Sequence, residues 1–354
     1  MIKTSFAAKA PAKLIISGEH SVVYGAPAIA MAINQYVVTT VGWLQKPGNK
    51  RQANPIINFN LLNLKYAKSH TLNTLILLKE QLQENYTAFL NGNCSIKEVI
   101  KKPFELLQYL VTNLIERLQL QISENLEIQV DSRIPIGSGL GSSAASIVSC
   151  LRSLAQLFKM HWEPKKFLKI ATDIENLQHG KSSGLDLYTT TFGGCTYFTN
   201  NLKNNFFEAQ NIILPNFDFK IINTGKPCST TGECVSMVKK HFVKLDLIKE
   251  FSYITEAIKL ALITNNKQQC IEAIKENHAL LCRLDVVPEK IKIFIKAVEQ
   301  VGGAAKICGA GSVYGDNAGI VMLLGDLEKI AKVVKDYQYQ LQDISVDYSG
   351  VTIV

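Results

Sequence analysis

The chain has 354 residues, 47% of them hydrophobic, and a formal net charge of +8 at pH 7. This length and apolar content are enough for one large domain or two medium ones, each with its own core. Lysine and arginine are scattered and form no basic run with interleaved aromatic residues, which argues against a nucleic-acid partner. The excess of positive charge favours a mildly basic enzyme that handles anionic substrates.

Cysteine spacing and hydropathy narrow the class of protein further. The eight cysteines include no Cys-x-x-Cys pair and most lie in apolar stretches, which predicts buried, reduced thiols and no zinc site. Lys9 and Lys13 interrupt the apolar start of the chain, so no signal peptide is expected. No uncharged run reaches the roughly 18 residues of a membrane helix. We therefore expect a cytoplasmic protein without a membrane partner.

The first third of the chain alternates strand and helix patterns. Residues 4–17 predict two short strands on either side of Ala10-Pro11, and residues 28–33 and 36–43 predict two more. Residues 45–54 predict an exposed loop, residues 72–90 a helix that ends at Asn91-Gly92, and residues 103–120 a helix with Pro103 in its first turn.

Between the first strands lies the loop Gly18-Glu-His-Ser-Val-Val-Tyr-Gly25. Its two glycines flank a carboxylate, Glu19, and an imidazole, His20. Such a density of ionisable groups beside an apolar strand is unusual for a connector. A solvated turn that carries a chance Glu-His pair remains the alternative.

A glycine-rich stretch follows the strand predicted at 126–131. Gly137, Gly139 and Gly141 precede Ser142 and Ser143, which start a helix predicted to run to residue 158. Glycines allow a sharp turn and close approach to a ligand, and a helix N-terminus presents free N–H groups, so this stretch can cradle a phosphate. The Ser143 hydroxyl is a candidate ligand for a phosphate-bound magnesium ion.

Two other phosphate-binding motifs do not fit this stretch. A P-loop requires a lysine before Ser142, and none is present. A dinucleotide fingerprint requires an acidic residue about 20 positions further on at the end of a second strand, but Trp162-Glu163-Pro164 indicates a helix start there. A plain strand-to-helix connection remains open.

The middle of the chain carries two acidic residues at the ends of a small loop. A helix predicted at 164–178 ends at Gly180, and Glu175 in its last turn lies eleven residues before Asp186. The intervening segment is His179-Gly-Lys-Ser-Ser-Gly-Leu. Gly193-Gly194 then opens a strand predicted at 195–198.

The composition changes near residues 214–218, where we place a boundary between domains 1–217 and 218–354. The second part predicts a strand at 219–223, helices from about 232 to 301, and a strand at 306–308 followed by the loop 309–315. Strands at 318–324 and 344–354 enclose a helix at 327–338. Helices mixed with antiparallel-type strands predict an α+β fold.

Four separated motifs, in order, resemble those of the GHMP kinase superfamily and within it the mevalonate kinase family. They are Lys13 with the loop 18–25, the stretch 135–144, Glu175 with the segment 179–186, and the segment 224–230. Homoserine kinases and galactokinases share the superfamily but differ in the first motif. The resemblance implies two domains, the first like ribosomal protein S5 and the second ferredoxin-like, with the active site in the cleft between them.

The resemblance also implies roles for individual residues. It implies an ATP-dependent kinase that phosphorylates the C5 hydroxyl of mevalonate, with Asp186 as the base and Lys13 beside it to keep its carboxylate ionised. Mg²⁺ would be held by Ser143 and Glu175. Mevalonate would contact Lys13, Glu19, His20, Asp186, Thr230 and Ala310. ATP would contact Pro135, Gly137, Ser138, Gly139, Leu140, Gly141, Ser142 and Ser143.

One motif departs from the family pattern. The usual Lys-x-Thr-Gly-Ala-Gly with further glycines is here Lys306-Ile-Cys-Gly-Ala-Gly311, followed by Ser-Val-Tyr. Cys308 replaces the usual hydroxyl there, and Val313 and Tyr314 are bulkier than glycine. The alternatives are a kinase of phosphomevalonate or another small alcohol, or an inactive nucleotide-binding regulator. The sequence leaves oligomeric state open, a homodimer among the options, together with nucleotide preference and inhibition by isoprenoid diphosphates.

Overall fold

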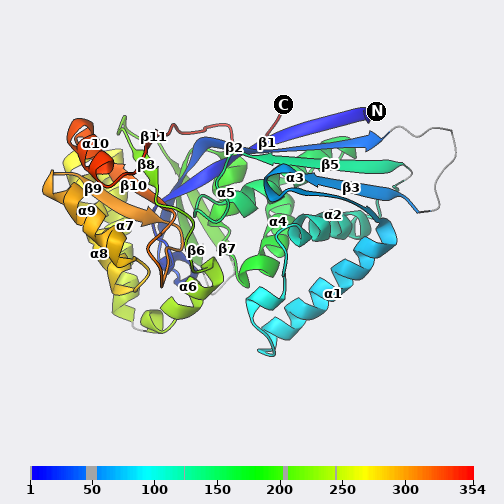
Figure 1. The fold of residues 1–354 in the computed structure, drawn as a ribbon, viewed down its shortest axis with the longest axis horizontal. Helices are drawn as coiled ribbons and strands as arrows, with labels where there is room; N and C mark the ends of the chain where they lie inside the picture. Colours follow the sequence, from blue (N-terminus) through cyan, green and yellow to red (C-terminus); the bar gives the residue numbers. More distant parts are fainter. Residues whose placement is uncertain (1, 45–53, 123, 202–205, 244) are drawn as a thin grey trace.

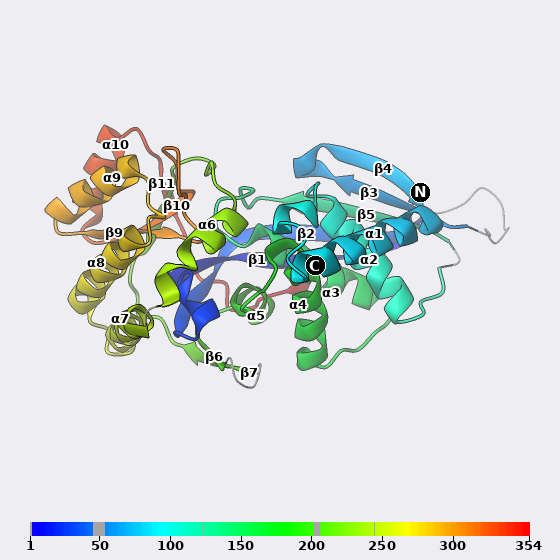
Figure 2. The same cartoon turned by 90° about the horizontal axis from the view of Figure 1, so that it is seen from below.

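The computed structural model describes residues 2–44, 54–122, 124–201, 206–243 and 245–354. These residues form two β-sheets flanked by helices (Figure 1 and, from below, Figure 2). We call the part built on the eight-stranded sheet, with helices α1–α5, the first lobe, and the part built on the four-stranded sheet, with helices α6–α10, the second lobe. Residues 45–53 of the loop predicted at 45–54 lie outside the described residues.

The eight-stranded sheet has the order β12-β1-β2-β5-β3-β4, and β6 pairs with both β2 and β7. All pairs are antiparallel except β3 with β5. Its strands are β1 Ile2–Ser17, β2 Ala28–Leu44, β3 Ile56–Leu61, β4 Tyr66–Thr71, β5 Asn125–Ser132, β6 Cys195–Asn201, β7 Phe206–Ile212 and β12 Thr352–Ile353.

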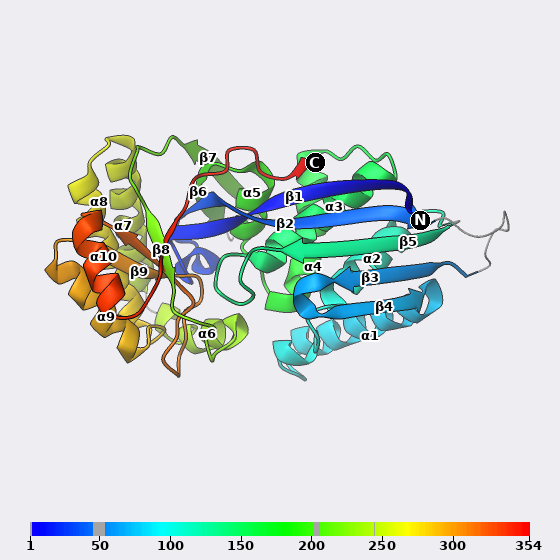
Figure 3. The same ribbon diagram turned by 45° about the horizontal axis from the view of Figure 1, so that its top comes forward.

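Helices cover one face of this sheet, as Figure 3 shows for α1–α4. The alternating burial of β5, with Leu126, Ile128 and Val130 inside, explains why a sheet with one covered face forms here. The helices are α1 Leu72–Leu90, α2 Glu105–Arg117, α3 Ser142–Leu157, α4 Pro164–His179 and α5 Leu185–Phe192, with short 3₁₀ turns η1 Ser21–Tyr24, η2 Leu62–Leu64 and η3 Ile96–Glu98.

The four-stranded sheet is antiparallel with the order β11-β8-β10-β9. Every residue of β9 and β10 is buried, because helices α8 and α9 pack against this sheet. The strands are β8 Lys220–Asn223, β9 Ala304–Cys308, β10 Ile320–Leu324 and β11 Leu341–Asp343. The helices are α6 Thr231–Val238, α7 Leu245–Ile263, α8 Lys267–Arg283, α9 Glu289–Gln300 and α10 Leu327–Asp336, with the 3₁₀ turn η4 His241–Val243.

A single β-bulge explains two strand breaks that the sequence pattern predicts. Pro11 pairs with Tyr36 and Ala12 pairs with Ile33, so residues 34 and 35 of β2 have no opposite partner in β1. Proline cannot donate a ladder hydrogen bond and is tolerated at such a bulge. The prediction of two short strands on each side was therefore wrong: β1 and β2 are each one long, bent strand.

The local patterns located most helices well and several strands poorly. The bounds predicted for α1 are confirmed, and those for α3 and α4 agree within three residues at each end. The helix predicted at 103–120 is shorter, because the Glu105 carboxylate accepts the N–H groups of Lys101 and Lys102 outside the helix and α2 starts at Glu105. The strand predicted at 344–354 was wrong. Only β12 forms there, and the patterns missed β3, β4, β7, β11 and α5.

The boundary at 217/218 remains a prediction. The end of the chain returns to the first lobe, where Thr352 pairs with Lys9 in β1 (Figure 1). Helix α7 of the second lobe also contacts β1, β2 and β7. The lobes therefore share an extensive contact instead of being joined by one linker.

The structure can be compared with two predictions from the sequence, one about the cysteines and one about membrane-spanning helices. All eight cysteines lie in the described residues and are free, and five of them are buried, which confirms the prediction of reduced, mostly buried thiols. Among the helices that the structure describes, none combines the length and apolar character of a membrane span.

Candidate active site

The glycine-rich segment connects β5 to α3 and turns at three glycines. Gly137, Gly139 and Gly141 have φ of 72°, 91° and 71°, in the left-handed region that glycine adopts without strain. Gly141 is also the N-cap of α3, so the first N–H groups of this helix receive no side-chain cap. These groups and the positive end of the helix dipole are available to an anionic ligand.

The three glycines have different surroundings. A Cβ added at Gly139 would overlap the carbonyl oxygen of Cys308 in the other lobe, and one added at Gly141 would lie 2.8 Å from Lys13 Cγ. At Gly137, Lys226 Cε at 3.9 Å is the only atom of the described residues, apart from Gly137 and its two chain neighbours, that such a Cβ would approach within 4 Å. Gly139 and Gly141 are thus required by packing within the protein, whereas Gly137 marks the open face of the loop.

Backbone and side-chain hydrogen bonds hold this loop from both lobes. Ser138 is buried, and its hydroxyl donates to the Pro135 carbonyl at 2.8 Å. The Ser138 carbonyl accepts from Ile320 N at 3.0 Å, and the Leu140 carbonyl accepts from Lys13 N at 3.0 Å. The loop is therefore fixed in place before any ligand binds.

Lys13 and Asp186 form an ion pair beside this loop. Lys13 is 3% exposed, and its Nζ lies 3.2 Å from Asp186 Oδ2 and donates to the Gly139 carbonyl at 3.0 Å. Asp186 is in the first turn of α5, after the N-cap Gly184, and its side chain is 29% exposed. A Cβ at Gly141 would lie 3.5 Å from Asp186 Oδ2, so residues from three distant parts of the chain converge here.

Glu175 lies near this pair at the buried end of α4. Its Oε2 accepts a hydrogen bond from Ser182 Oγ, and Ser182 N donates to Asn176 Oδ1 at 2.7 Å. Burial raises the pKa of Glu175 to about 8, and the charge of Asp186 raises it in the same direction. Burial also lowers the pKa of the neighbouring His179.

The loop 18–25 contributes two residues that reach the other lobe. The buried Glu19 carboxylate forms an ion pair with Lys306 of β9, which also donates to the Ile15 carbonyl at 3.3 Å. His20 has φ of 62° and its Nε2 donates to the Ala310 carbonyl at 3.0 Å. Burial lowers the pKa of His20 to about 4, so the ring is neutral at pH 7 and its Nδ1 is an acceptor.

Thr230 has a different environment from the other predicted residues. It is exposed and is the N-cap of α6, where its hydroxyl accepts from Glu233 N and donates to Glu233 Oε2 at 2.9 Å. The Glu233 carboxylate also pairs with Lys97 of the first lobe at 2.6 Å and accepts from Tyr314 OH at 3.1 Å. Tyr314, which departs from the glycines of the family motif, thus joins a link between the lobes.

Sequence reasoning missed three residues at this site. Ser182 orients Glu175, Lys306 pairs with Glu19, and Lys226 lies over Gly137. Ser182 had a local signal, since a Ser-Ser-Gly turn follows the helix that carries Glu175. Lys226 had none, because it acts on a residue far away in the sequence. Lys306 is the first residue of the motif at 306–311, but nothing local paired it with Glu19. The half-buried Ser143 is at the second position of α3.

The oxygen donors here fit a magnesium ion. The Glu175 carboxylate is buried and close to the charge of Asp186, and both conditions raise its pKa. A cation bound between these two groups would compensate their negative charge. Within the described residues, no group of three or more His, Cys, Asp or Glu side chains is arranged to hold a metal. Mg²⁺ commonly uses one or two carboxylates with water and substrate phosphates, so a donor set of this size suits it.

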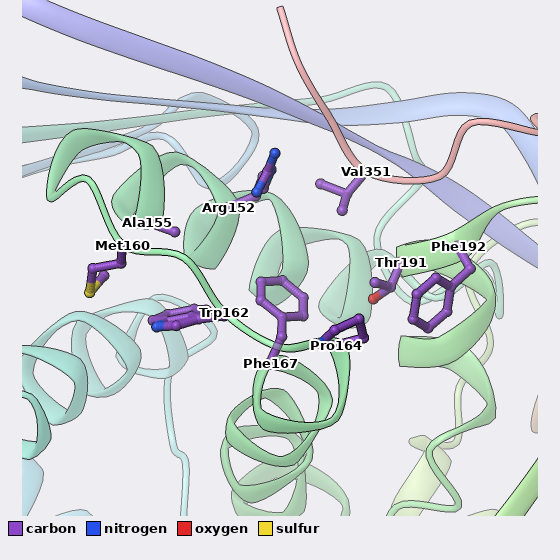
Figure 4. Close-up of a pocket in the computed structure, with 9 residues that line it drawn as sticks. All are labelled: Arg152, Ala155, Met160, Trp162, Pro164, Phe167, Thr191, Phe192 and Val351. Atoms are coloured by element: carbon purple, nitrogen blue, oxygen red, sulfur yellow. The ribbon is translucent and has the colours of Figure 1, made fainter.

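A separate hollow lies away from these residues. Figure 4 shows it between the end of α3, the start of α4 and the end of α5, with Trp162, Phe167 and Phe192 among its apolar walls. Its volume is about 150 Å³, below the range of ordinary ligand pockets. No predicted site residue lines it.

Comparisons with known proteins agree with this arrangement. The family model described as GHMP kinases N terminal domain matches residues 105–194, which include the glycine loop, Glu175 and Asp186. A mevalonate kinase of Archaeoglobus fulgidus is 30% identical over 310 residues, covering 86% of this chain and 88% of the relative. The chain belongs to the mevalonate kinase family. Another mevalonate kinase, of Methanocaldococcus jannaschii, is 29% identical and covers 92% of this chain and 94% of the relative.

Solved mevalonate kinases have the same fold. The Methanococcus jannaschii enzyme matches with a TM-score of 0.74 and 25% identity, covering 98% of this chain and 99% of that one. The L. major mevalonate kinase in complex with R-mevalonate matches with a TM-score of 0.69 and 19% identity, covering 99% of both chains. The prediction of a GHMP kinase fold is confirmed.

Proposed function

We propose that this member of the mevalonate kinase family transfers the γ-phosphoryl group of ATP to the C5 hydroxyl of mevalonate, forming 5-phosphomevalonate and ADP. Relatives that match most of the chain are mevalonate kinases, and kinases of this family use ATP. The observation that carries the proposal is the Lys13–Asp186 pair at 3.2 Å beside the glycine loop. It brings a proton acceptor and a cation to the place where an anion can be held.

Phosphoryl transfer requires mainly positioning and charge stabilisation. In the proposed reaction the C5 oxygen attacks the γ-phosphorus, the bond to the β–γ bridging oxygen breaks, and ADP leaves. Asp186 accepts the proton of the C5 hydroxyl. Lys13 stabilises negative charge on the attacking oxygen, and its bond to the Gly139 carbonyl keeps it next to the loop that would hold the phosphates. Pro135, Ser138, Leu140 and Ser142 complete that loop.

Acceptors in the loop 18–25 suit the hydroxyl groups of the substrate. Glu19 Oε2 is buried without a hydrogen-bond partner among the described residues, and Nδ1 of neutral His20 is an acceptor. A hydroxyl donor of mevalonate would satisfy either atom. Ala310 would contribute to mevalonate binding through its contact with His20. Thr230 would contribute through its hydroxyl, which lies at the start of α6.

We propose that Ser143 and Glu175 hold magnesium, which when bound would neutralise charge on the phosphate oxygens. Ser182 would keep the Glu175 carboxylate oriented. Ser143→Ala and Glu175→Ala should each need more Mg²⁺ for half-maximal rate and for half-saturation of nucleotide binding, with Ser146→Ala, a serine one turn further along α3, as the matched control. Titration curves that coincide with those of the parent would remove these residues from the metal site.

A coupled assay of ADP release from the purified protein tests the proposal. Mevalonate should be turned over far faster than phosphomevalonate, homoserine or galactose. Faster turnover of another alcohol would assign a different substrate. No turnover with any of them, together with intact ATP binding, would favour a nucleotide-binding regulator.

A further inference from the structure

Lys226 follows β8 in the second lobe and its backbone is fixed tightly. The preceding residues are tied to the start of β10: Thr224 N donates to the Gly319 carbonyl at 2.8 Å, and Gly319 N donates to the Gly225 carbonyl at 3.2 Å. The Thr224 hydroxyl donates to that same Gly319 carbonyl at 2.8 Å and accepts from Ala318 N at 3.0 Å. The position of Lys226 is therefore set by the sheet of the second lobe.

The same short segment also holds the glycine loop of the first lobe. Ile320 N donates to the Ser138 carbonyl at 3.0 Å, and a Cβ added at Gly319 would lie 2.5 Å from that carbonyl oxygen. Residues 318–320 thus bridge Lys226 and the loop. The position of the Lys226 backbone relative to the glycine loop therefore depends on backbone hydrogen bonds and not on a flexible surface side chain.

The Lys226 side chain extends over Gly137, the open glycine among the three of this loop. A Cβ at Gly137 would lie 3.9 Å from Lys226 Cε, with no other atom of the described residues within 4 Å apart from those of Gly137 and its chain neighbours. Lys226 itself is exposed, and no carboxylate of the described residues lies within ion-pair distance of its ammonium group. By contrast, the other cation at the loop, Lys13, is buried and already paired with Asp186.

We propose that Lys226 is a nucleotide-binding residue whose ammonium group contacts the phosphate chain of ATP at the open face of the loop by Gly137. This rests on the proposed function, since it places ATP in the loop. The exposed ammonium group of Lys226 has no ion pair to break before it pairs with phosphate, and lysine binds phosphate as a point charge. It also gives Gly137 a reason to lack a side chain, because any Cβ would stand between the cation and the phosphates.

Three variants test this proposal: Lys226→Met, Lys226→Arg and a control, Lys332→Met. The control removes an exposed lysine of α10. Calorimetry measures the binding of the non-hydrolysable ATP analogue AMPPNP, and displacement of AMPPNP by adenosine measures the binding of adenosine. Steady-state kinetics measure KM for ATP and KM for mevalonate separately. Lys226→Met should weaken AMPPNP binding and raise KM for ATP roughly 10- to 100-fold. Adenosine, which has no phosphate, should bind as in the parent. Lys226→Arg should stay nearer the parent, and Lys332→Met should match it.

The outcomes separate this inference from the proposed function. Unchanged AMPPNP affinity in Lys226→Met, with an active parent, overturns the role of Lys226 alone. A higher KM for mevalonate with unchanged AMPPNP affinity also overturns it and places the cation at the substrate carboxylate. A parent that binds AMPPNP but phosphorylates no alcohol overturns the proposed reaction, while the binding data still decide the role of Lys226. A parent that does not bind AMPPNP overturns both.

Discussion

Glu19 and Lys306 form an ion pair that is wholly buried, although Glu19 follows β1 in the first lobe and Lys306 lies in β9 of the second. Burial raises the pKa of Glu19, and the charge of Lys306 opposes this rise. The pair ties the loop 18–25, and with it His20, to the other lobe. Removing one partner leaves the other charge buried and unpaired, which is more costly than removing both.

We therefore expect Lys306→Met to lower the free energy of unfolding by roughly 3–5 kcal/mol. The double variant Glu19→Gln/Lys306→Met should recover part of this loss, because neither charge of the pair is then left buried without its partner. Chemical denaturation of both variants, with Lys332→Met as a control, measures the effect. Additive losses in the double variant would contradict a coupled pair.

Asp186 and Lys13 should act as a unit in turnover. Asp186→Asn is nearly isosteric, so folding and AMPPNP binding should persist while kcat falls by roughly 10² to 10⁴. The loss should be near the lower figure if the transition state is dissociative, since the base then matters less. Lys13→Met should also slow turnover, and the double variant should lose less than the product of the two effects. A parent-like kcat in Asp186→Asn would remove it as the base.

The glycine loop can be probed with a matched pair of alanine substitutions. Gly137 and Gly92 have similar φ, 72° and 77°, and open surroundings, so Gly137→Ala and Gly92→Ala should carry a similar folding cost of about 1–2 kcal/mol. Only Gly137→Ala should weaken AMPPNP binding. Gly139→Ala, whose Cβ would overlap the Cys308 carbonyl, should instead destabilise the protein. Equal AMPPNP affinity in the Gly137 and Gly92 variants would place the phosphate cradle elsewhere.

Thr230 combines an observed structural role with a proposed substrate contact. Thr230→Ala removes the N-cap of α6 and should lower the free energy of unfolding by about 1 kcal/mol. It should also raise KM for mevalonate, whereas Thr230→Ser should keep both properties near those of the parent. A loss of stability with an unchanged KM would assign the hydroxyl to the cap alone.

The buried His278 of α8 should make stability depend on acidic pH. Burial lowers its pKa from 6.5 to about 4, and the charges of Lys306 and Lys292 act in the same direction. Between these values the unfolded chain binds a proton that the folded protein does not, so stability falls as pH drops from 6.5 to 4, by at most about 1.4 kcal/mol per pH unit. His278→Gln should flatten this part of the curve of unfolding free energy against pH. His20, whose pKa is also about 4, should maintain a residual slope.

Local sequence patterns determined the helices and the candidate phosphate loop. The α1 helix ends where the Asn91-Gly92 turn predicts, and three glycines between a strand and a helix indicate the loop because glycine adopts its left-handed backbone without strain. Periodicity and glycine positions are properties of neighbouring residues, so one sequence is enough to interpret them.

Only the tertiary structure decided which distant residues meet. Glu19 and Lys306 are 287 positions apart, and Lys13 and Gly139 are 126 apart. The bulge that pairs Pro11 with Tyr36 and the return of β12 to β1 arise from strand pairing within the first lobe. The position of Lys226 over Gly137 arises from packing the two lobes together. No local pattern encodes such contacts, because the same strand or loop would satisfy its own propensities with other partners. Burial of both sheets selects the single arrangement in which these side chains are neighbours.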